Sequence, residues 1–398
     1  MNHFAIYGLL LIAIASGWLL GRLSSSSKKV GAARNSSFKD DYFVGLNYLL
    51  NDEPDEAIDT FIRSLQVNSE TIDTHLALGA LLRRRGKVDK AIQVHQALLA
   101  RPALDQSVID ATRIHLAKDY ISSGLLDRAE RLLHEILSED SRAQWEALKL
   151  LITIYQTEKE WEKAIDCSRR LLSNPEFKRD ADIRSAAAHY CCELAEKMIT
   201  DEQFRKAKEH IRRSFGFDRK SVRASFVLAT IEQNLGNYKA AIKELVRIRT
   251  NNPEFMSQIL GPLAECYSQL EQLPEYEKLL ANSLPDEPDI SVVLALSDLV
   301  KKRAGDDAAI HFLNEYLTQK PSLSGLLELL KLQTLQADEQ VVGNLSILQQ
   351  MIGRLLSKQS GYQCNHCGYE SKRLYWLCPS CKKWDKIKPI LEADSIAH

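Results

Sequence analysis

The chain has 398 residues, 45% of them hydrophobic and 26% charged, which is the composition of an ordinary folded protein. Its 52 Lys and Arg residues nearly balance its 53 Asp and Glu residues. The molecule as a whole therefore has no field that attracts nucleic acid or an acidic substrate, and any such partner needs a local patch.

The first segment is an uncharged apolar stretch, FAIYGLLLIAIASGWLL, from Phe4 to Leu20. As a helix it rises about 26 Å, at the short end of what spans a hydrocarbon core. A secretory signal peptide is the alternative, because AIAS offers small residues for cleavage, but the segment lacks the basic n-region of such signals. The sequence therefore predicts a transmembrane signal anchor over residues 1–22, with Trp18 at the membrane interface.

Basic residues follow this span, among them Arg22, Lys28 and Lys29. By the positive-inside rule, these charges keep the downstream chain in the cytoplasm and place the short N-terminus on the other side of the membrane. We interpret residues 23–39 as a polar, basic linker.

Residues 40–356 are interpreted as one array of repeats, in which small residues recur at a similar interval up to about residue 250 and match more poorly after it. The intervals are 34, 38, 35, 43 and 34 residues between Ala57, Ala91, Ala129, Ala164, Ala207 and Ala241. Five of the six residues twelve positions earlier are also small: Gly45, Gly79, Ala117, Ile152, Ala195 and Ala229. Glycines stand five positions before three of the alanines, where a turn between two helices requires them: Gly86, Gly124 and Gly236.

This is the tetratricopeptide pattern. Each unit is a pair of antiparallel helices, and small side chains at two facing positions let the backbones approach. One pair cannot bury its apolar stripe alone, so the pairs stack into a superhelix. The predicted fold is an all-α tetratricopeptide solenoid with about six clear repeats, two degenerate ones and SGLLELLKLQTLQ as a cap. Insertions around ARPALDQSVID and SNPEFKRDADI should lengthen a helix or a loop.

Four of the eight cysteines lie in this array: Cys167, Cys191, Cys192 and Cys266. Adjacent cysteines do not normally bridge to each other, and a chain of this size needs no disulfides, so we expect small core residues in a reducing compartment. Scattered His, Glu and Asp residues are expected on solvated helix faces. Phosphate-loop, zincin and nucleophile-elbow motifs are absent from the sequence, so we do not expect an enzyme.

The other four cysteines lie in CNHCGYESKRLYWLCPSC, residues 364–381. The pairs Cys364–Cys367 and Cys378–Cys381 each have the Cys-x2-Cys spacing, which aims two thiolates at one point, and two such turns complete a tetrahedron. Lys382 stands where a glycine commonly follows the second turn, and His366 is expected in solvent. The sequence predicts a rubredoxin-like domain over residues 357–398 that binds one metal ion through four cysteines.

Zinc and iron both accept tetrahedral sulfur. Iron would make the domain an electron carrier, whereas zinc would make it a structural ribbon. Zinc is favoured because nothing else in the chain suggests a flavin or nicotinamide partner. A metal-based redox module on a scaffold stays open as an alternative function.

Aromatic and basic residues surround the cysteines, a mixture that can bind single-stranded RNA. The other interpretation is docking, because a ribbon this small needs outside support. We favour docking of Tyr375, Trp376 and Trp384 onto the repeats, with no nucleic acid as partner.

The order of these parts closely resembles the lipopolysaccharide assembly protein B family of Gram-negative bacteria. The resemblance is carried by DYFVGLNYLLNDEPDEAIDTFI at the first repeat and YQCNHCGYESKRLYWLCPSCKKWDKIKP at the end. It implies a single-pass inner-membrane protein with a periplasmic N-terminus and a cytoplasmic bulk. It also implies an adaptor that brings the LpxC deacetylase of the lipid A pathway to the membrane AAA+ protease FtsH for degradation, under a further inner-membrane regulator.

Overall fold

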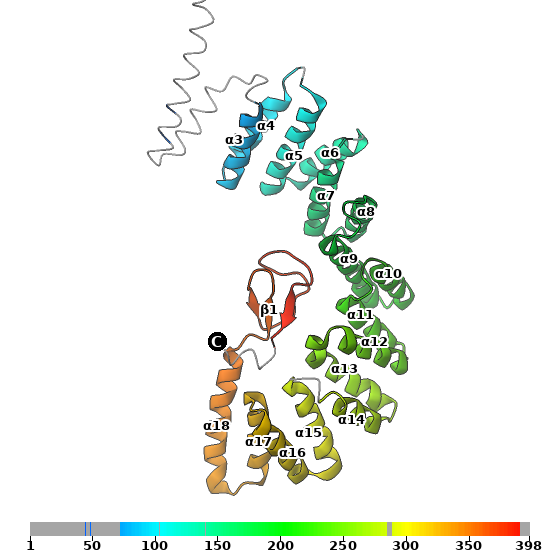
Figure 1. Cartoon of the computed structure of the whole chain (residues 1–398), viewed down its shortest axis with the longest axis vertical. Helices are drawn as coiled ribbons and strands as arrows, with labels where there is room; N and C mark the ends of the chain where they lie inside the picture. The colour runs from blue at the N-terminus through cyan, green and yellow to red at the C-terminus, as the bar shows by residue number, and fades with distance from the viewer. Residues whose placement is uncertain are drawn as a thin grey trace, which may run out of the picture. The chain divides into compact units, whose positions relative to one another are not determined.

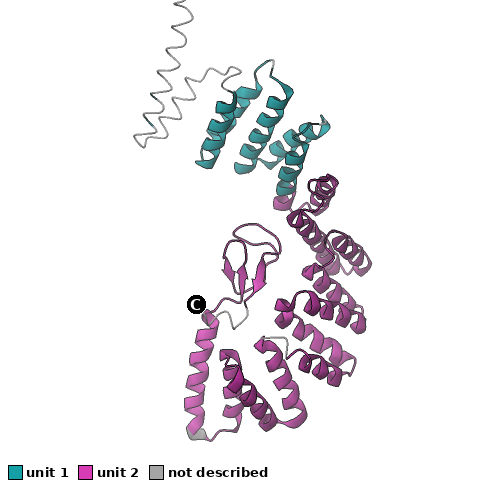
Figure 2. Cartoon of the chain, viewed as in Figure 1, with its two compact units in different colours: residues 1–154 teal, residues 155–398 magenta. Residues whose placement is uncertain are grey.

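A computed structural model describes residues 44, 48 and 72–390, except 103, 140 and 285–288. In this part the helices α3 to α18 follow one another and three short strands come last (Figure 1). The chain divides into two compact units, residues 1–154 and 155–398, with the boundary inside α7 (Figure 2).

The predicted anchor from Phe4 to Leu20, with Trp18, lies outside the described residues, as do the charges at Arg22, Lys28 and Lys29 and the repeat around Ala57. Within the described ranges, every helix is too short or too polar to cross a membrane.

Unit 1 holds α3 (Ile72–Arg84), α4 (Val88–Leu99), α5 (Gln106–Ser122), α6 (Leu126–Ser138) and the first part of α7 (Gln144–Glu158). The helices of unit 2 up to the middle of the array are α8 (Trp161–Leu172), α9 (Ala181–Thr200), α10 (Phe204–Phe217), α11 (Val222–Asn234) and α12 (Tyr238–Asn251). They are followed by the 3-10 turn η1 (Pro253–Phe255), α13 (Met256–Gln269), α14 (Leu273–Ala281), α15 (Ile290–Ala304), α16 (Asp306–Gln319), α17 (Leu323–Gln336) and α18 (Glu339–Lys358).

Consecutive helices pack as pairs. The pairs are α3 with α4, α5 with α6, α9 with α10, α11 with α12, α13 with α14, α15 with α16 and α17 with α18. The recurring alanines lie at the centres of the helix packing and are 0% exposed at Ala91, Ala129, Ala164, Ala207 and Ala241. At Gly79 an added Cβ would lie 2.3 Å from the imidazole of His95, so this position requires glycine. The predicted all-α solenoid of helix pairs is confirmed in this part of the chain.

The turns inside the pairs share one backbone conformation. Gly86, Gly124 and Gly236 have φ of 77°, 77° and 75°. The corresponding residues of other turns are Lys159, Glu202 and Glu271, with φ of 60°, 57° and 56°. The turn is therefore kept where glycine is missing, although the left-handed region disfavours a side chain.

The two predicted insertions are confirmed. The first insertion includes the start of α5, which is 17 residues long. The second forms the loop before α9 and the start of α9, which is 20 residues long. The degenerate units correspond to α13 with α14 and α15 with α16. The segment predicted as a cap is α17, and it is half of a further pair because α18 packs against it.

The expectation that charged residues of the repeats lie on solvated faces is wrong at Asp119. This residue is 0% exposed, and its carboxylate accepts hydrogen bonds from Arg83 Nη1 at 2.6 Å and His95 Nδ1 at 2.5 Å. A buried carboxylate is tolerated here because it has hydrogen-bonding partners, one of which carries the opposite charge.

The ribbon at the end of the chain has three strands, β1 (Tyr362–Cys364), β2 (Glu370–Ser371) and β3 (Ile387–Pro389). They form an antiparallel sheet in the order β2-β1-β3, with Gln363 opposite both Glu370 and Lys388. The two Cys-x2-Cys turns lie in the loops that these strands support. The sheet therefore sets the distance between the turns.

Candidate metal centre and its docking surface

The two Cys-x2-Cys turns have matching backbone hydrogen bonds. The N–H of Gly368 donates to the carbonyl of Cys364 at 2.9 Å, and the N–H of Lys382 donates to the carbonyl of Cys378 at 3.0 Å. Gly368 and Lys382 both take the left-handed conformation, with φ of 73° and 57°. The second turn therefore forms although lysine replaces glycine in it.

The four sulfur atoms form a compact cluster in which all lie within 4.8 Å of one another. The Sγ atoms of Cys364 and Cys381 are 3.8 Å apart, and those of Cys367 and Cys378 are 3.7 Å apart. Four thiolates around one tetrahedral ion with metal–sulfur bonds of about 2.3 Å are separated by about 3.8 Å. The four cysteines thus form a rubredoxin-like metal site, and this geometry suits zinc and iron equally.

The backbone supports the ionised form of an outer ligand. The thiolate of Cys367 accepts a hydrogen bond from the backbone of Tyr369, and this lowers the pKa of the Cys367 thiol to about 6. Because metals bind the thiolate, the hydrogen bond favours the binding form. His366 is exposed and does not belong to the cluster, as the sequence predicts.

The ribbon has a very small core of its own. Cys364, Cys378 and Ile387 are buried, and four partly buried side chains pack on them: Tyr362, Tyr369, Leu374 and Cys381. Two of the three buried residues are metal ligands. Such a core is too small to hold the ribbon without the ion and outside contacts.

Trp384 is the most buried aromatic residue of the ribbon, at 7% exposed. Its Nε1 donates to Gln156 Oε1 at 2.8 Å, and the same oxygen accepts from the Tyr190 hydroxyl at 2.9 Å. The indole stacks on His189 of α9, with ring centroids 4.9 Å apart. The helices of unit 2 therefore provide both a stacking partner for the indole ring and a hydrogen-bond acceptor for its N–H.

Trp376 contacts three elements of the array. Its ring stacks on Phe255 of η1 at 5.9 Å between centroids, and it lies 6.3 Å from Phe226 of α11 and 5.8 Å from His189 of α9. Leu374 packs against the same core cluster as Trp376, a contact that the sequence did not single out. Tyr375, the third residue predicted to dock, is 41% exposed.

Lysines of the ribbon pair with carboxylates. Lys386 Nζ lies 2.9 Å from Asp182 of α9, and this hydrogen bond lowers the pKa of the Asp182 carboxyl below its usual range. Lys388 Nζ lies 3.9 Å from Glu254 of η1 and 3.2 Å from Asp385. Because these lysines have acidic partners and both tryptophans are packed, the geometry favours docking over binding of a single strand.

Two polar side chains are buried in the array under the tryptophans. His189 is 2% exposed, and its burial, together with the charges of Arg223 and Lys388, holds the pKa of the imidazole well below 6.5. Arg223 is 4% exposed and donates to Glu196 at 2.8 and 2.9 Å and to Glu193 at 2.7 Å. The neutral imidazole can therefore stack on Trp384, while the arginine keeps its charge through paired carboxylates.

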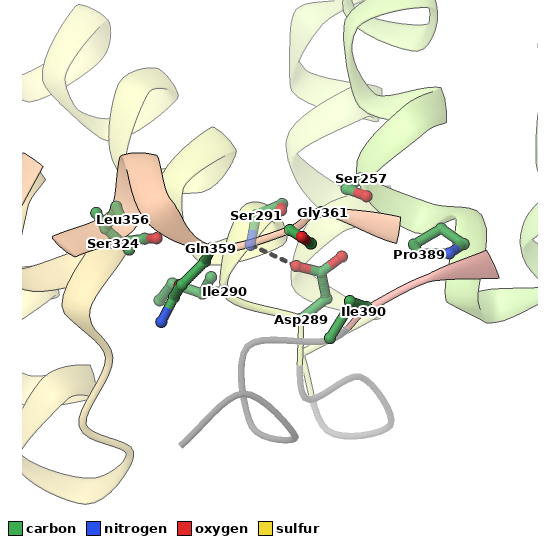
Figure 3. A pocket seen from close by; sticks show the side chains of 11 residues that line it. Ser257, Asp289, Ile290, Ser291, Ser324, Leu356, Gln359, Gly361, Pro389 and Ile390 are labelled. Carbon is green, nitrogen blue, oxygen red and sulfur yellow. Dashed lines mark hydrogen bonds between the residues drawn. The ribbon is translucent and has the colours of Figure 1, made fainter. Parts of the chain in front are cut away.

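A cavity of about 290 Å³ lies where the ends of the ribbon meet α15 and α18 (Figure 3). The carboxylate of Asp289 in its wall accepts a hydrogen bond from the N–H of Ser291 at 2.8 Å and caps α15. Gly361 and Ile390, at the two ends of the ribbon, also line it. The aspartate thus has a structural role as a helix cap.

Comparisons with known proteins found relatives of both the ribbon and the helical repeats. A family model described as rubredoxin metal binding domain matches residues 362–389, and one described as tetratricopeptide repeat matches residues 74–107. The chain is 32% identical to lipopolysaccharide assembly protein B of Escherichia coli strain K12, over 98% of this chain and 99% of that protein. It is 33% identical to the protein of the same name from Haemophilus influenzae strain Rd, over 97% and 98% of the two chains.

Among solved structures, a tetratricopeptide repeat protein from Parabacteroides merdae aligns with 71% of this chain and 100% of its own length, at 14% identity and a TM-score of 0.35.

Proposed function

The chain belongs to the lipopolysaccharide assembly protein B family, and on this premise we propose that it acts in lipopolysaccharide assembly as an adaptor anchored in the inner membrane. The helical array binds the LpxC deacetylase and brings it to the membrane protease FtsH, which degrades it. A further inner-membrane regulator adjusts this delivery. The N-terminus is periplasmic and the bulk of the chain cytoplasmic.

The observation that carries this proposal is similarity along the whole length, over 98% of this chain and 99% of a relative named for lipopolysaccharide assembly. A stack of helix pairs is a binding scaffold, and catalysis in this proposal belongs to the protease. An adaptor and a protease in the same bilayer meet at a raised effective concentration.

We further propose that the four cysteines hold zinc and that the ribbon braces the binding surface. The packing of Trp376 and Trp384 on α9, α11 and η1 supports this role, because it fixes the ribbon against three separate elements of the array. An anaerobically purified protein should be colourless and contain one zinc per chain. A visible iron absorption band would favour the redox alternative.

The delivery proposal is tested by depleting the protein in its own cell and measuring the half-life of LpxC after synthesis is stopped. We expect depletion to lengthen the half-life of LpxC. Expression of the intact chain should return the half-life to its normal value, and expression of a chain that lacks residues 1–22 should not. A half-life of LpxC that stays unchanged on depletion would show that delivery is not the function.

A further inference from the structure

The last helix of the array, α18, has two apolar faces. The first face packs on α17, where Gln349 donates to the Leu330 carbonyl at 3.1 Å and to the Thr334 hydroxyl at 2.7 Å. The second face, here called the α18 face, consists of five exposed residues: Val341 at 47%, Ile347 at 58%, Leu348 at 47%, Met351 at 57% and Leu355 at 55%. With 3.6 residues per turn, the two faces are roughly 100° apart around the helix.

The exposed Asn344 also lies on this face, one turn from both Val341 and Leu348. Five exposed apolar side chains on one face still require an explanation, whereas single exposed apolar residues do not. In a solenoid each pair covers the flank of its neighbour, and terminal repeats normally present a polar outer face. Within the described residues α18 is the final helix, and Figure 1 shows it beside α17. The α18 face is thus an apolar surface where a polar one is expected.

We infer that the α18 face joins two copies of this chain end to end, with the two α18 helices packed antiparallel. A two-fold axis brings the same patch of each copy onto the other, so one apolar stripe supplies both sides of the interface. The stretch QVVGNLSILQQMIG, residues 340–353, contains no Asp, Glu, Lys or Arg. Two such stretches can meet without opposing like charges, and interface cores are poor in charged residues and rich in Met.

The charges at the ends of α18 select the antiparallel arrangement. Asp338 precedes the helix, and Arg354 and Lys358 lie in its last turns. In an antiparallel pair the basic end of one helix lies at the level of the acidic start of the other. A parallel pair would place like charges together.

The composition of α18 also argues against a membrane surface as the partner. Helices that lie on membranes carry Lys and Arg along their polar face, whereas the polar residues of 340–353 are Gln, Asn and Ser. The five side chains expose roughly 500 Å² per copy, so the dimer buries about 1,000 Å², at the lower end of specific interfaces. We expect a dissociation constant on the order of 1 µM in solution.

The test uses the intact chain in detergent or nanodiscs, with its mass measured by light scattering or sedimentation over a range of concentrations. The wild type should be a dimer, and Leu348→Glu should raise the dissociation constant of the dimer by at least about 30-fold. The matched control Leu273→Glu changes a residue that is 41% exposed on α14, and it should dimerise like the wild type. Both variants should keep their helical circular dichroism and metal content.

Orientation is tested by mixing a Val341→Cys chain with a Leu355→Cys chain and adding a short bismaleimide, with the wild type as control for the native cysteines. We expect the mixed pair to crosslink more than either variant alone. A monomeric wild type, a Leu348→Glu dimer as tight as the wild type, or efficient crosslinking of Lys358→Cys to itself would overturn the inference.

Discussion

The ribbon and the helical array differ in where their stability comes from. The array buries apolar side chains in every described pair, and one of its core clusters alone extends from Val222 to Leu296. The ribbon buries three residues of its own, two of them metal ligands. The array is therefore stabilised by many neighbouring contacts, and the ribbon by one ion and two tryptophans that lie on helices of the array.

It follows that a substitution in the array should lower stability locally and by a limited amount. A substitution in the ribbon should affect the whole ribbon at once. Four predictions test this, in order of decreasing expected effect.

The largest effect is expected for Cys378→Ser, which removes a ligand that is 0% exposed. The metal should be lost, and with it folding free energy on the order of 10 kcal/mol. Metal analysis and limited proteolysis of residues 362–389 measure the loss, while the helical circular dichroism should change little. Cys266→Ala, at a buried cysteine of α13, is the control and should keep the metal. A metal-free ribbon that resists protease would contradict the comparison.

The second prediction concerns docking. Trp384→Ala removes the stacking on His189 and the hydrogen bond to Gln156, so docking should weaken by about 3–5 kcal/mol. Hydrogen exchange of residues 362–389 should rise while the metal stays bound. Tyr375→Ala, at a residue 41% exposed, should change docking by less than about 0.5 kcal/mol. Equal effects of the two substitutions would refute a docking surface made by the tryptophans.

The third prediction is a pH dependence. The pKa of His189 is lowered by burial beside Arg223 and Lys388, whereas a histidine released to solvent titrates near 6.5. The undocked state therefore binds a proton that the docked state excludes. Docking should be at full strength above about pH 6.5 and weaken by up to about 1.4 kcal/mol per pH unit below it.

Tryptophan fluorescence between about pH 7.5 and 5.5 measures this slope, with metal content followed in parallel because acid also releases metals from thiolates. His189→Phe should keep the stacking and remove the slope. The same slope in that variant would assign the acid sensitivity to the thiolates.

The smallest effect is expected in the array. Glu202 holds a left-handed turn with φ of 57°, the conformation that Gly86, Gly124 and Gly236 hold in other turns. Glu202→Gly should raise the free energy of unfolding by about 1 kcal/mol or less, because glycine adopts this conformation without strain. Thermal unfolding measures the gain, and Glu202→Ala is the control. An unchanged or lower stability would mean that the turn carries no strain.

The repeat positions and the metal ligands were predictable from sequence because their signals are local. Ala207 and Ala241 are 34 residues apart, the length of one repeat, and the four cysteines form two short motifs. The partners of the ribbon were not predictable in this way. His189, Arg223 and Gln156 look like ordinary helix residues, and only tertiary packing brings them to Trp384. The burial of Asp119 was missed for the same reason, since Arg83 and His95 lie on other helices.

The hydrogen bond between Trp384 and Gln156 joins residues 228 positions apart in the chain. Closing a flexible loop of that length would cost on the order of 5 kcal/mol in chain entropy. The helix pairs between the two residues form from near-neighbour contacts, so they are ordered before the ribbon arrives and the loop is no longer flexible. Because the ribbon follows the described helices in the chain, it leaves the ribosome after them, and its docking comes later than the folding of those helices. A surface that requires the docked ribbon therefore becomes complete only after the described helix pairs have formed and the metal is bound.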